Sequence, residues 1–168
     1  MDFPQIYEEY FDRIYAYIRC RVNSVCAAED IAMQVFKNAY KKSAQYDSAR
    51  GNIAQWLFGI ARNETNYHLR MAVLRTFFPL DIFDSDIAST ETTVLDALVA
   101  EEDILKLKSA LEVLNTRERE LVTLKFYSEL NNREIAKLTG LGESNVGTTL
   151  CRAMAKLRQT FGRTDENM

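Results

Sequence analysis

The most specific chemistry in this chain lies in polar and basic side chains near its C-terminus. Between Asn145 and Arg163 there are four basic residues and no acidic one, so one helix face here can contact phosphates. Short polar side chains stand before the basic ones and can approach the edges of base pairs. The candidates for reading duplex DNA are Ser144, Asn145, Thr148, Thr149, Arg152 and Lys156.

The elements expected to position these side chains are two helices that cross steeply. Such a pair needs a small residue at the contact, a glycine at the turn and an apolar residue inside the second helix, and Ala136, Gly140 and Val146 meet these needs. Asn131, with Glu134 three residues later, predicts a capping box, and Ser144 is expected to cap the second helix. The pattern predicts a helix-turn-helix, with an ordinary helical hairpin as the alternative.

A second group suited to nucleic acid runs from Tyr46 to Arg70. Aromatic rings stack on unpaired bases, while Arg, Asn and Gln bond base edges and backbone. Trp56 shares the apolar stripe of the expected helix with Ile53, so we assign it to packing and favour Tyr46 for stacking. The candidates are Tyr46, Asp47, Arg50, Asn52, Gln55, Arg62, Asn63, Asn66 and Arg70.

The sequence contains no clear sign of an enzyme active site. It has no glycine-rich phosphate loop and no plausible nucleophile–base pair, and its single histidine, His68, is expected at the surface or at a hinge. The three cysteines, Cys20, Cys26 and Cys151, form no CxxC pair and are expected to be reduced and mostly packed. We predict a non-enzymatic protein with no metal site and no cofactor.

Helical periodicity runs through most of the 168 residues, and glycine (6) and proline (2) are scarce, which predicts an all-α fold. The expected helices include one over Phe3–Ile18 and one that begins near Ala27; Asn52 is expected to cap a third, with Gln55 as its capping-box partner, and Asn115 is expected to cap a later one. No stretch approaches the roughly 18 apolar residues of a membrane span. The N-terminus lacks the pattern of a secretory signal, so a cytoplasmic location is expected.

Charge divides the chain into three parts. Residues 1–71 hold 9 Lys and Arg against 8 Asp and Glu, residues 72–104 hold 1 against 8, and residues 105–168 hold 11 against 8. An acidic middle between neutral and basic ends predicts two modules and a connector. The expected boundaries are a first module over residues 1–75, an acidic linker over 76–104 and a second module over 105–168.

Several runs together resemble the extracytoplasmic-function (ECF) sigma factors of the sigma-70 family. In the first module they are AEDI at residues 28–31, VF at 35–36, YDSARGN at 46–52 and WLFGIARN at 56–63. In the second they are LNTRERE at 114–120, EIA at 134–136 and RA at 152–153. Order, spacing and total length also agree with that family, and only the linker is left out.

The resemblance implies an alternative sigma factor that directs bacterial RNA polymerase to promoters. It implies that the first module docks the polymerase core and opens the −10 element with the Tyr46–Arg70 group, and that the last helix reads the −35 element. It leaves open an anti-sigma factor as a further partner. The polymerase-binding candidates that it implies are Glu29, Asp30, Gln34 and Asn38.

Five positions depart from the usual family pattern. Met33-Gln34 replace a Gln-Glu pair, Tyr67 replaces a common aspartate, and Gly147 and Thr149 replace basic residues of the recognition helix. We therefore expect few charge contacts to the −35 element. The alternative function is a stand-alone helix-turn-helix regulator, which would need neither the melting segment nor the polymerase-docking helix.

Overall fold

Helices account for nearly all of the structure, a computed structural model that describes residues 2–77 and 107–165. The described part contains no β-strand, so the all-α prediction is confirmed. The predicted linker lies outside the described residues except for residues 76 and 77, which continue the third helix. The elements are α1 (Phe3–Arg19), α2 (Val25–Lys41), the 3-10 turn η1 (Ser43–Gln45), α3 (Ile53–Phe77), a helical turn at 107–111, α5 (Thr116–Ser128), α6 (Asn132–Thr139) and α7 (Glu143–Asp165).

The helices begin where side chains can satisfy their first backbone amides. Asn115 and Glu118 form the predicted capping box on α5, with bonds of 2.9 and 3.0 Å between each side chain and the other residue's amide. Asn131 and Glu134 form the second predicted box, on α6, with two bonds of 2.9 Å. The Asn52 side chain accepts from the Gln55 amide at 2.7 Å, as expected for the start of α3.

Two predicted helix starts need correction. α2 begins at Val25, two residues before Ala27, because the Ser24 hydroxyl accepts the Ala27 amide and so provides the cap. α7 begins at Glu143, so Ser144 lies inside its first turn and is not its cap. Gly142 has the cap position instead, since its carbonyl accepts the Val146 amide at 3.0 Å.

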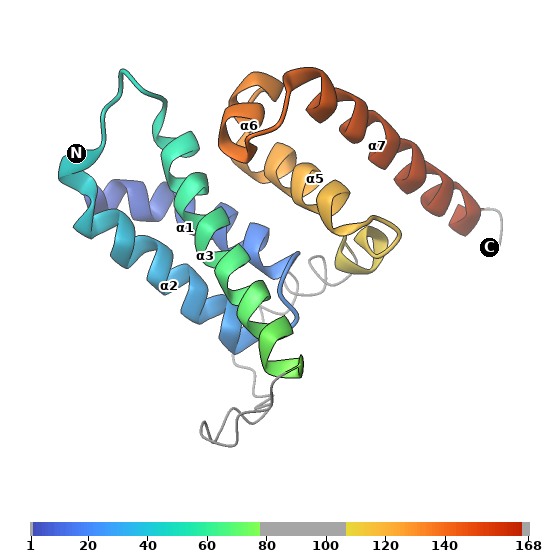
Figure 1. Ribbon diagram of the computed structural model, residues 1–168, viewed down its shortest axis with the longest axis horizontal. Coiled ribbons are helices and arrows are strands. Elements are labelled where there is room, and N and C mark those ends of the chain that lie inside the picture. The colour runs from blue at the N-terminus through green and yellow to red at the C-terminus, as the bar shows by residue number, and fades with distance from the viewer. Residues whose placement is uncertain (1, 78–106, 166–168) are drawn as a thin grey trace.

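The first three helices pack as a bundle (Figure 1). Ile14 and Tyr17 of α1 meet Val35 of α2 and Leu57 and Phe58 of α3, and all five side chains are fully buried. Phe36 joins a group of aromatic rings from α1, with its centroid 4.8 Å from that of Tyr7 and 5.9 Å from that of Phe11. This bundle fixes the direction of α3.

The second module packs α6 and α7 against α5. Gly140 ends α6 with a φ of 73°, which glycine adopts without strain, and the chain turns there into α7. Ala136 and Val146 are buried where the helices meet, as the predicted helix-turn-helix requires. Leu111 and Leu114 close the other end of α5 with Ala153 and Leu157 of α7.

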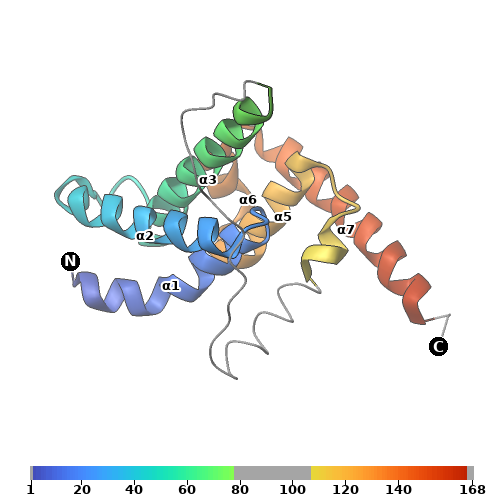
Figure 2. The same cartoon turned by 90° about the horizontal axis from the view of Figure 1, so that it is seen from below.

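The two modules also pack against each other, an arrangement that the sequence analysis did not predict. Leu121, Leu124 and Leu130 belong to the same apolar cluster as Ile14 and Tyr17 of the first module. Figure 2 shows α5 and α6 lying against α1 and α3, and residues of α5 contact both of those helices. The described residues therefore form one joined body in which the inner faces of both modules are covered.

Candidate nucleic-acid interface

The N-terminal half of α7 presents most of its predicted DNA-reading residues to solvent. Ser144, Asn145, Thr148 and Arg152 are exposed, and Thr149 is half-buried. Two hydrogen bonds here are local to the helix: the Thr148 hydroxyl donates to the Ser144 carbonyl at 2.8 Å, and the Thr149 hydroxyl donates to the Asn145 side chain at 3.2 Å. This face is available to a DNA groove without any rearrangement.

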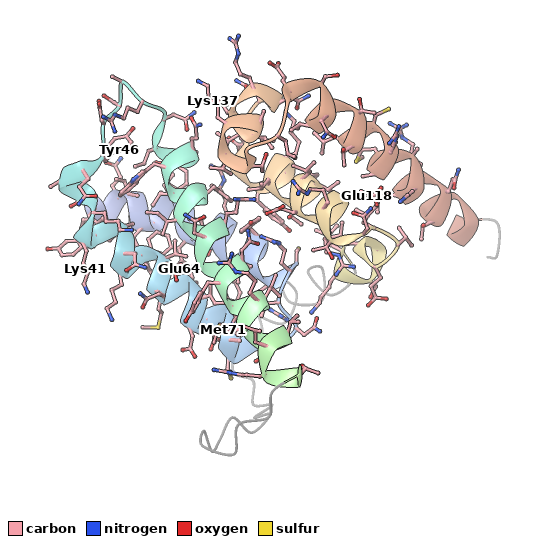
Figure 3. All side chains as sticks on the ribbon, viewed as in Figure 1. Lys41, Tyr46, Glu64, Met71, Glu118 and Lys137 are labelled. Atoms are coloured by element: carbon pink, nitrogen blue, oxygen red, sulfur yellow. The ribbon has the colours of Figure 1, made fainter. Side chains whose placement is uncertain are left out.

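Lys156 differs from the other predicted residues of α7 because it is already paired. Its ammonium group donates to both carboxylate oxygens of Glu118 at 2.8 Å. These bonds favour the carboxylate and lower the pKa of Glu118 from its ordinary value. Figure 3 shows Glu118 at the N-terminal end of α5. Lys156 thus ties α7 to α5, and its predicted phosphate contact would compete with this pair.

A hollow of about 420 Å³ lies at the loop before α3. The Tyr46 ring lies against Trp56, with the ring centroids 5.3 Å apart, and the Tyr46 hydroxyl donates to the Gly51 carbonyl at 3.2 Å. The hollow brings together six of the nine residues predicted from this stretch: Tyr46, Asp47, Arg50, Asn52, Gln55 and Asn63. Two aromatic rings beside several hydrogen-bonding groups can receive an unpaired base.

Trp56 only partly fits its assignment to packing. It is half-buried, and one side of it lines the hollow. Gly51 is needed at the rim, because a Cβ there would lie 2.6 Å from the Gln55 side-chain oxygen. Figure 3 shows Tyr46 near the loop and Lys137 on α6 across from it. The hollow is therefore bordered by both modules, and Leu138 of α6 is among its lining residues.

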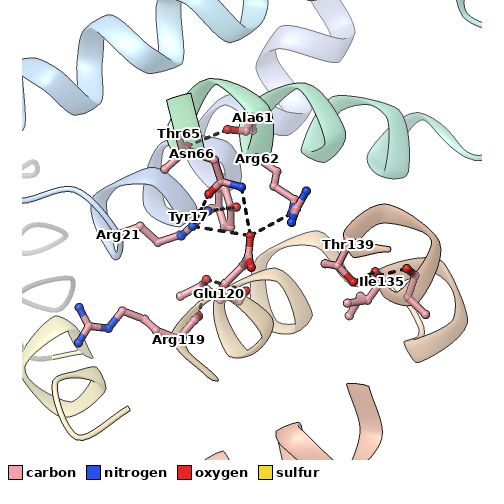
Figure 4. A network of polar contacts seen from close by, with 12 residues as sticks. Tyr17, Arg21, Ala61, Arg62, Thr65, Asn66, Arg119, Glu120, Ile135 and Thr139 are labelled. Atoms are coloured by element: carbon pink, nitrogen blue, oxygen red, sulfur yellow. Dashed lines mark hydrogen bonds and ion pairs between the residues drawn. The ribbon is translucent and has the colours of Figure 1, made fainter. Parts of the chain in front are cut away.

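Arg62 and Asn66 lie outside the hollow and face the second module (Figure 4). Arg62 Nε donates to Glu120 Oε1 at 2.9 Å, and Asn66 Nδ2 lies 3.4 Å from the same oxygen. Arg21 Nη2 lies 3.7 Å from that oxygen and donates to Asn66 Oδ1 at 2.6 Å. We call Arg21, Arg62, Asn66 and Glu120 the Glu120 cluster. The ninth candidate, Arg70, is exposed on α3 away from the cluster.

The Glu120 cluster is largely shielded from water. The side chains of Arg21, Glu120 and Arg62 are 4%, 8% and 20% exposed. Tyr17 lies beside Arg21, and burial raises the pKa of its hydroxyl to about 12. Sequence reasoning missed Arg21 and Glu120; the available signal was a glutamate directly before the apolar residues of α5, Leu121 and Leu124.

A second polar contact joins the modules near the hollow. Asn52 Nδ2 donates to Glu134 Oε1 at 3.0 Å. Close by, a Cβ added to Gly59 would lie 3.4 Å from Leu138, so glycine here lets α6 approach α3. Three of the nine predicted residues of this stretch, Asn52, Arg62 and Asn66, therefore bond to glutamates of the second module.

The predicted polymerase-binding residues divide into two pairs. Glu29 and Asp30 are exposed on α2. Gln34 and Asn38 are half-buried, because Gln34 donates to Asn38 at 3.2 Å and Asn38 donates to Glu64 of α3 at 2.9 Å. Of the four candidates, only Glu29 and Asp30 are thus fully open to a partner.

The structure also places the sequence departures and the thiols. Met33 and Tyr67, at two of the five departure positions, are 70% and 58% exposed. The expectation of mostly packed thiols is wrong: Cys20 is buried, with its sulfur 3.6 Å from the Tyr127 hydroxyl, but Cys26 and Cys151 are exposed.

Within residues 2–77 and 107–165, no cluster of three or more His, Cys, Asp or Glu could hold a metal ion, and no helix is long and apolar enough to cross a bilayer.

Two separate parts of the chain match the sigma-70 family. Residues 6–73 match sigma-70 region 2, and residues 104–157 match sigma-70 region 4. The chain therefore belongs to the sigma-70 family. Most of the curated relatives that it matches are named as ECF sigma factors, which identifies the ECF group within that family.

Three of these relatives are proteins of different bacteria. The chain is 30% identical to the ECF RNA polymerase sigma factor BldN of Streptomyces coelicolor, over 92% of this chain and 58% of BldN. It is 26% identical to RpoE of Cereibacter sphaeroides, over 94% of this chain and 84% of RpoE. It is also 26% identical to SigM of Bacillus subtilis, over 97% of both chains.

Two solved structures share the fold. The sigma factor RpoE in complex with the anti-sigma factor NepR, from Bartonella quintana, superposes with a TM-score of 0.76 at 21% identity, over 96% of this chain and 97% of that chain. CnrH in complex with the cytosolic domain of CnrY gives a TM-score of 0.68 at 20% identity, over 96% and 88% of the chains. These similarities support the two-module helical architecture.

Proposed function

We propose that this protein is an alternative, ECF-type sigma factor that binds the RNA polymerase core, directs it to specific promoters and initiates transcription. The observation that carries the proposal is the match of both regions 2 and 4, in order, on one chain. A stand-alone helix-turn-helix regulator would explain region 4 but has no use for region 2. The protein is an initiation factor, and we propose that it has no catalytic residues of its own and acts in the cytoplasm.

Within this function we assign three surfaces. The hollow beside Tyr46 and Trp56 receives a base of the −10 element, and the exposed start of α7 reads the −35 element in the major groove. The exposed carboxylates of Glu29 and Asp30 contact the polymerase core. The assignment is supported by the clustering of six predicted residues around one hollow and by the exposure of α7.

We also include an anti-sigma factor among the partners. One structural neighbour is a complex of this kind, the sigma factor RpoE with the anti-sigma factor NepR. The partner of this chain would have to contact one or both modules to keep it from polymerase.

A run-off transcription assay tests the function. Core polymerase is combined with this protein and a library of genomic promoter fragments, and transcripts absent with core alone are expected. Asp30→Lys should reduce recovery of core in a pull-down, while Glu112→Lys, an equal charge change on an exposed residue of the second module, should not. Duplex binding without any new transcript would favour the stand-alone regulator instead.

A further inference from the structure

One basic residue on the DNA-reading face of α7 is bonded to a carboxylate of its own module. Thr148, Arg152 and Lys156 follow one another at intervals of four residues in α7, so they lie on one face of that helix. Lys156 Nζ donates to both carboxylate oxygens of Glu118 at 2.8 Å. We propose that Glu118 is a built-in counter-charge that keeps Lys156 from DNA phosphates and so limits how strongly α7 binds any duplex. This inference rests on the proposed function for the assignment of α7 to duplex DNA.

The Glu118 carboxylate is held in place within α5. Glu118 belongs to the capping box of that helix, where its Oε2 accepts the Asn115 amide at 3.0 Å. Its side chain is only 8% exposed. The bonds from Lys156 and from the Asn115 amide lower the pKa of Glu118, so the carboxylate is ionised at neutral pH. It therefore presents a fixed negative charge that cannot follow Lys156 to a DNA strand.

Burial decides the competition between this carboxylate and a phosphate. If Lys156 moved to DNA, the Glu118 carboxylate would stay shielded from water and would lose the charge that compensates for its desolvation, which is costly. A phosphate at the surface of DNA already has water and counterions around it, so it gains less from the same ammonium group. The bond from Lys156 to Glu118 is therefore the stronger of the two.

The ion pair between Arg133 of α6 and Glu143 of α7 has the opposite character. Arg133 Nε lies 3.9 Å from Glu143 Oε2, and the two side chains are 77% and 60% exposed. Such a pair is weak and is screened by salt, so Arg133 can turn to a phosphate at little cost. The buried partner is what distinguishes Lys156 from Arg133.

The pairing changes the kind of contact on which duplex binding by α7 depends. Lys156 and Glu118 together carry no net charge, and the exposed Arg152 remains as a basic residue of this face. The charge of Arg152 also contributes to the lowered pKa of Glu118, so the carboxylate weakens the positive potential at both basic residues. Binding should therefore depend more on hydrogen bonds from the short polar side chains at the start of α7 than on release of counterions.

The salt dependence of duplex binding tests the proposal. The full-length protein is titrated against a fluorescent mixed-sequence duplex at salt concentrations from about 50 to 200 mM. Glu118→Gln removes the charge but keeps an oxygen that can accept the Asn115 amide, so the helix cap is retained. This variant should bind more tightly than the wild type and should steepen the slope of log affinity against log salt by about 0.9, the value for one phosphate contact. Its advantage over the wild type should then shrink about 3.5-fold across that salt range.

Two further variants identify the group that carries the gain. The double variant Glu118→Gln with Lys156→Gln has an uncharged pair in place of a neutralised one, so its slope should equal that of the wild type. Glu112→Gln removes the same charge from an exposed residue of the same module and should also leave the slope unchanged. Circular dichroism checks that all the variants keep the helix content of the wild type.

Three outcomes would overturn the proposal. A wild-type slope as steep as that of Glu118→Gln, and steeper than that of the double variant, would mean that Lys156 leaves Glu118 when DNA binds. A double variant as steep as Glu118→Gln would mean that the gain does not come through Lys156. Equal slopes in all four proteins would place the pair outside the DNA interface. Failure of the proposed function is distinguishable, because it would abolish run-off transcripts and leave the slopes as expected.

Discussion

The two candidate DNA surfaces of this protein differ in how many of their residues are bonded to other parts of the protein. At the start of α7 most of the predicted residues are exposed and bonded only to their own helix. On α3 and the loop before it, Asn52, Arg62 and Asn66 are bonded to glutamates of the other module. On the proposed assignment, the start of α7 can therefore contact duplex DNA as it stands, whereas three residues of the −10 surface are already bonded to the second module.

Two glutamates that cap helices also differ in whether they bond within a module or between modules. Glu118 and Glu134 occupy equivalent positions in the capping boxes of α5 and α6. Glu118 also binds Lys156 inside its own module, while Glu134 also binds Asn52 across the module boundary. The same local motif thus supports internal rigidity in one helix and contact between modules in the next.

The largest expected effect comes from the apolar cluster that the modules share. Leu124→Ala should lower the free energy of unfolding by about 2–5 kcal/mol, because Leu124 is fully buried and leaves a cavity. Urea denaturation followed by circular dichroism and by tryptophan fluorescence measures this. Trp56 lies in the first module and Leu124 in the second, so a fluorescence transition that moves with the mutation indicates one cooperative unit. A transition that stays unchanged would show that the modules unfold independently.

The second prediction concerns the available surface. Arg152→Ala should weaken binding of the preferred duplex by about 1–3 kcal/mol and relax the preference at one base pair. Because the start of α7 is already exposed, the loss should be equal in the wild type and in a Glu120→Lys background, which breaks the Glu120 cluster. Binding selections on randomised duplexes measure this loss for Arg152→Ala against its parent, once in the wild type and once in the Glu120→Lys background. A loss confined to the Glu120→Lys background would mean that α7 is also masked.

The third prediction concerns the masked surface. Tyr46→Ala should remove stacking worth about 1–3 kcal/mol per base and reduce permanganate-reactive open complex. Core binding should stay unchanged, since Tyr46 lies far along the chain from Glu29 and Asp30. The loss of oligonucleotide binding should be clearer in the Glu120→Lys background, where the Glu120 carboxylate no longer competes for Arg62 and Asn66. An equal loss in both backgrounds would contradict the difference between the two surfaces.

The smallest expected effect is on the pair that ties α7 to α5. The Lys156 bonds lower the pKa of Glu118, so their stabilisation is present above the ordinary carboxyl pKa and is lost as the pH falls through the lowered value. Lys156 is 45% exposed, so Lys156→Met should cost only about 0.5–1 kcal/mol at pH 7. Urea denaturation at neutral and acidic pH measures the difference, with the exposed Lys137→Met as control. A difference that persists in acid would rule out the ion pair as its cause.

Local features of the fold were the most predictable. The capping boxes at Asn115 and Asn131 and the left-handed Gly140 depend on residues within four positions of each other, so their pattern is visible along the chain. The start of α7 was misplaced because Ser144 and Gly142 are both plausible caps and only the backbone path selects between them. The thiols were misjudged because exposure depends on neighbours distant in sequence.

The amino-acid sequence by itself determined the family, the helical class, the helix-turn-helix and the residue types able to contact nucleic acid, because all of these depend on spacing within short segments. Only the tertiary structure decided which of those residues are available. Arg62 and Glu120 are far apart in the chain, and nothing in the periodicity of either helix indicates that they meet at 2.9 Å. The shared apolar cluster brings them together, because burying Leu121 and Leu124 against α1 carries the neighbouring glutamate to the arginines of the first module.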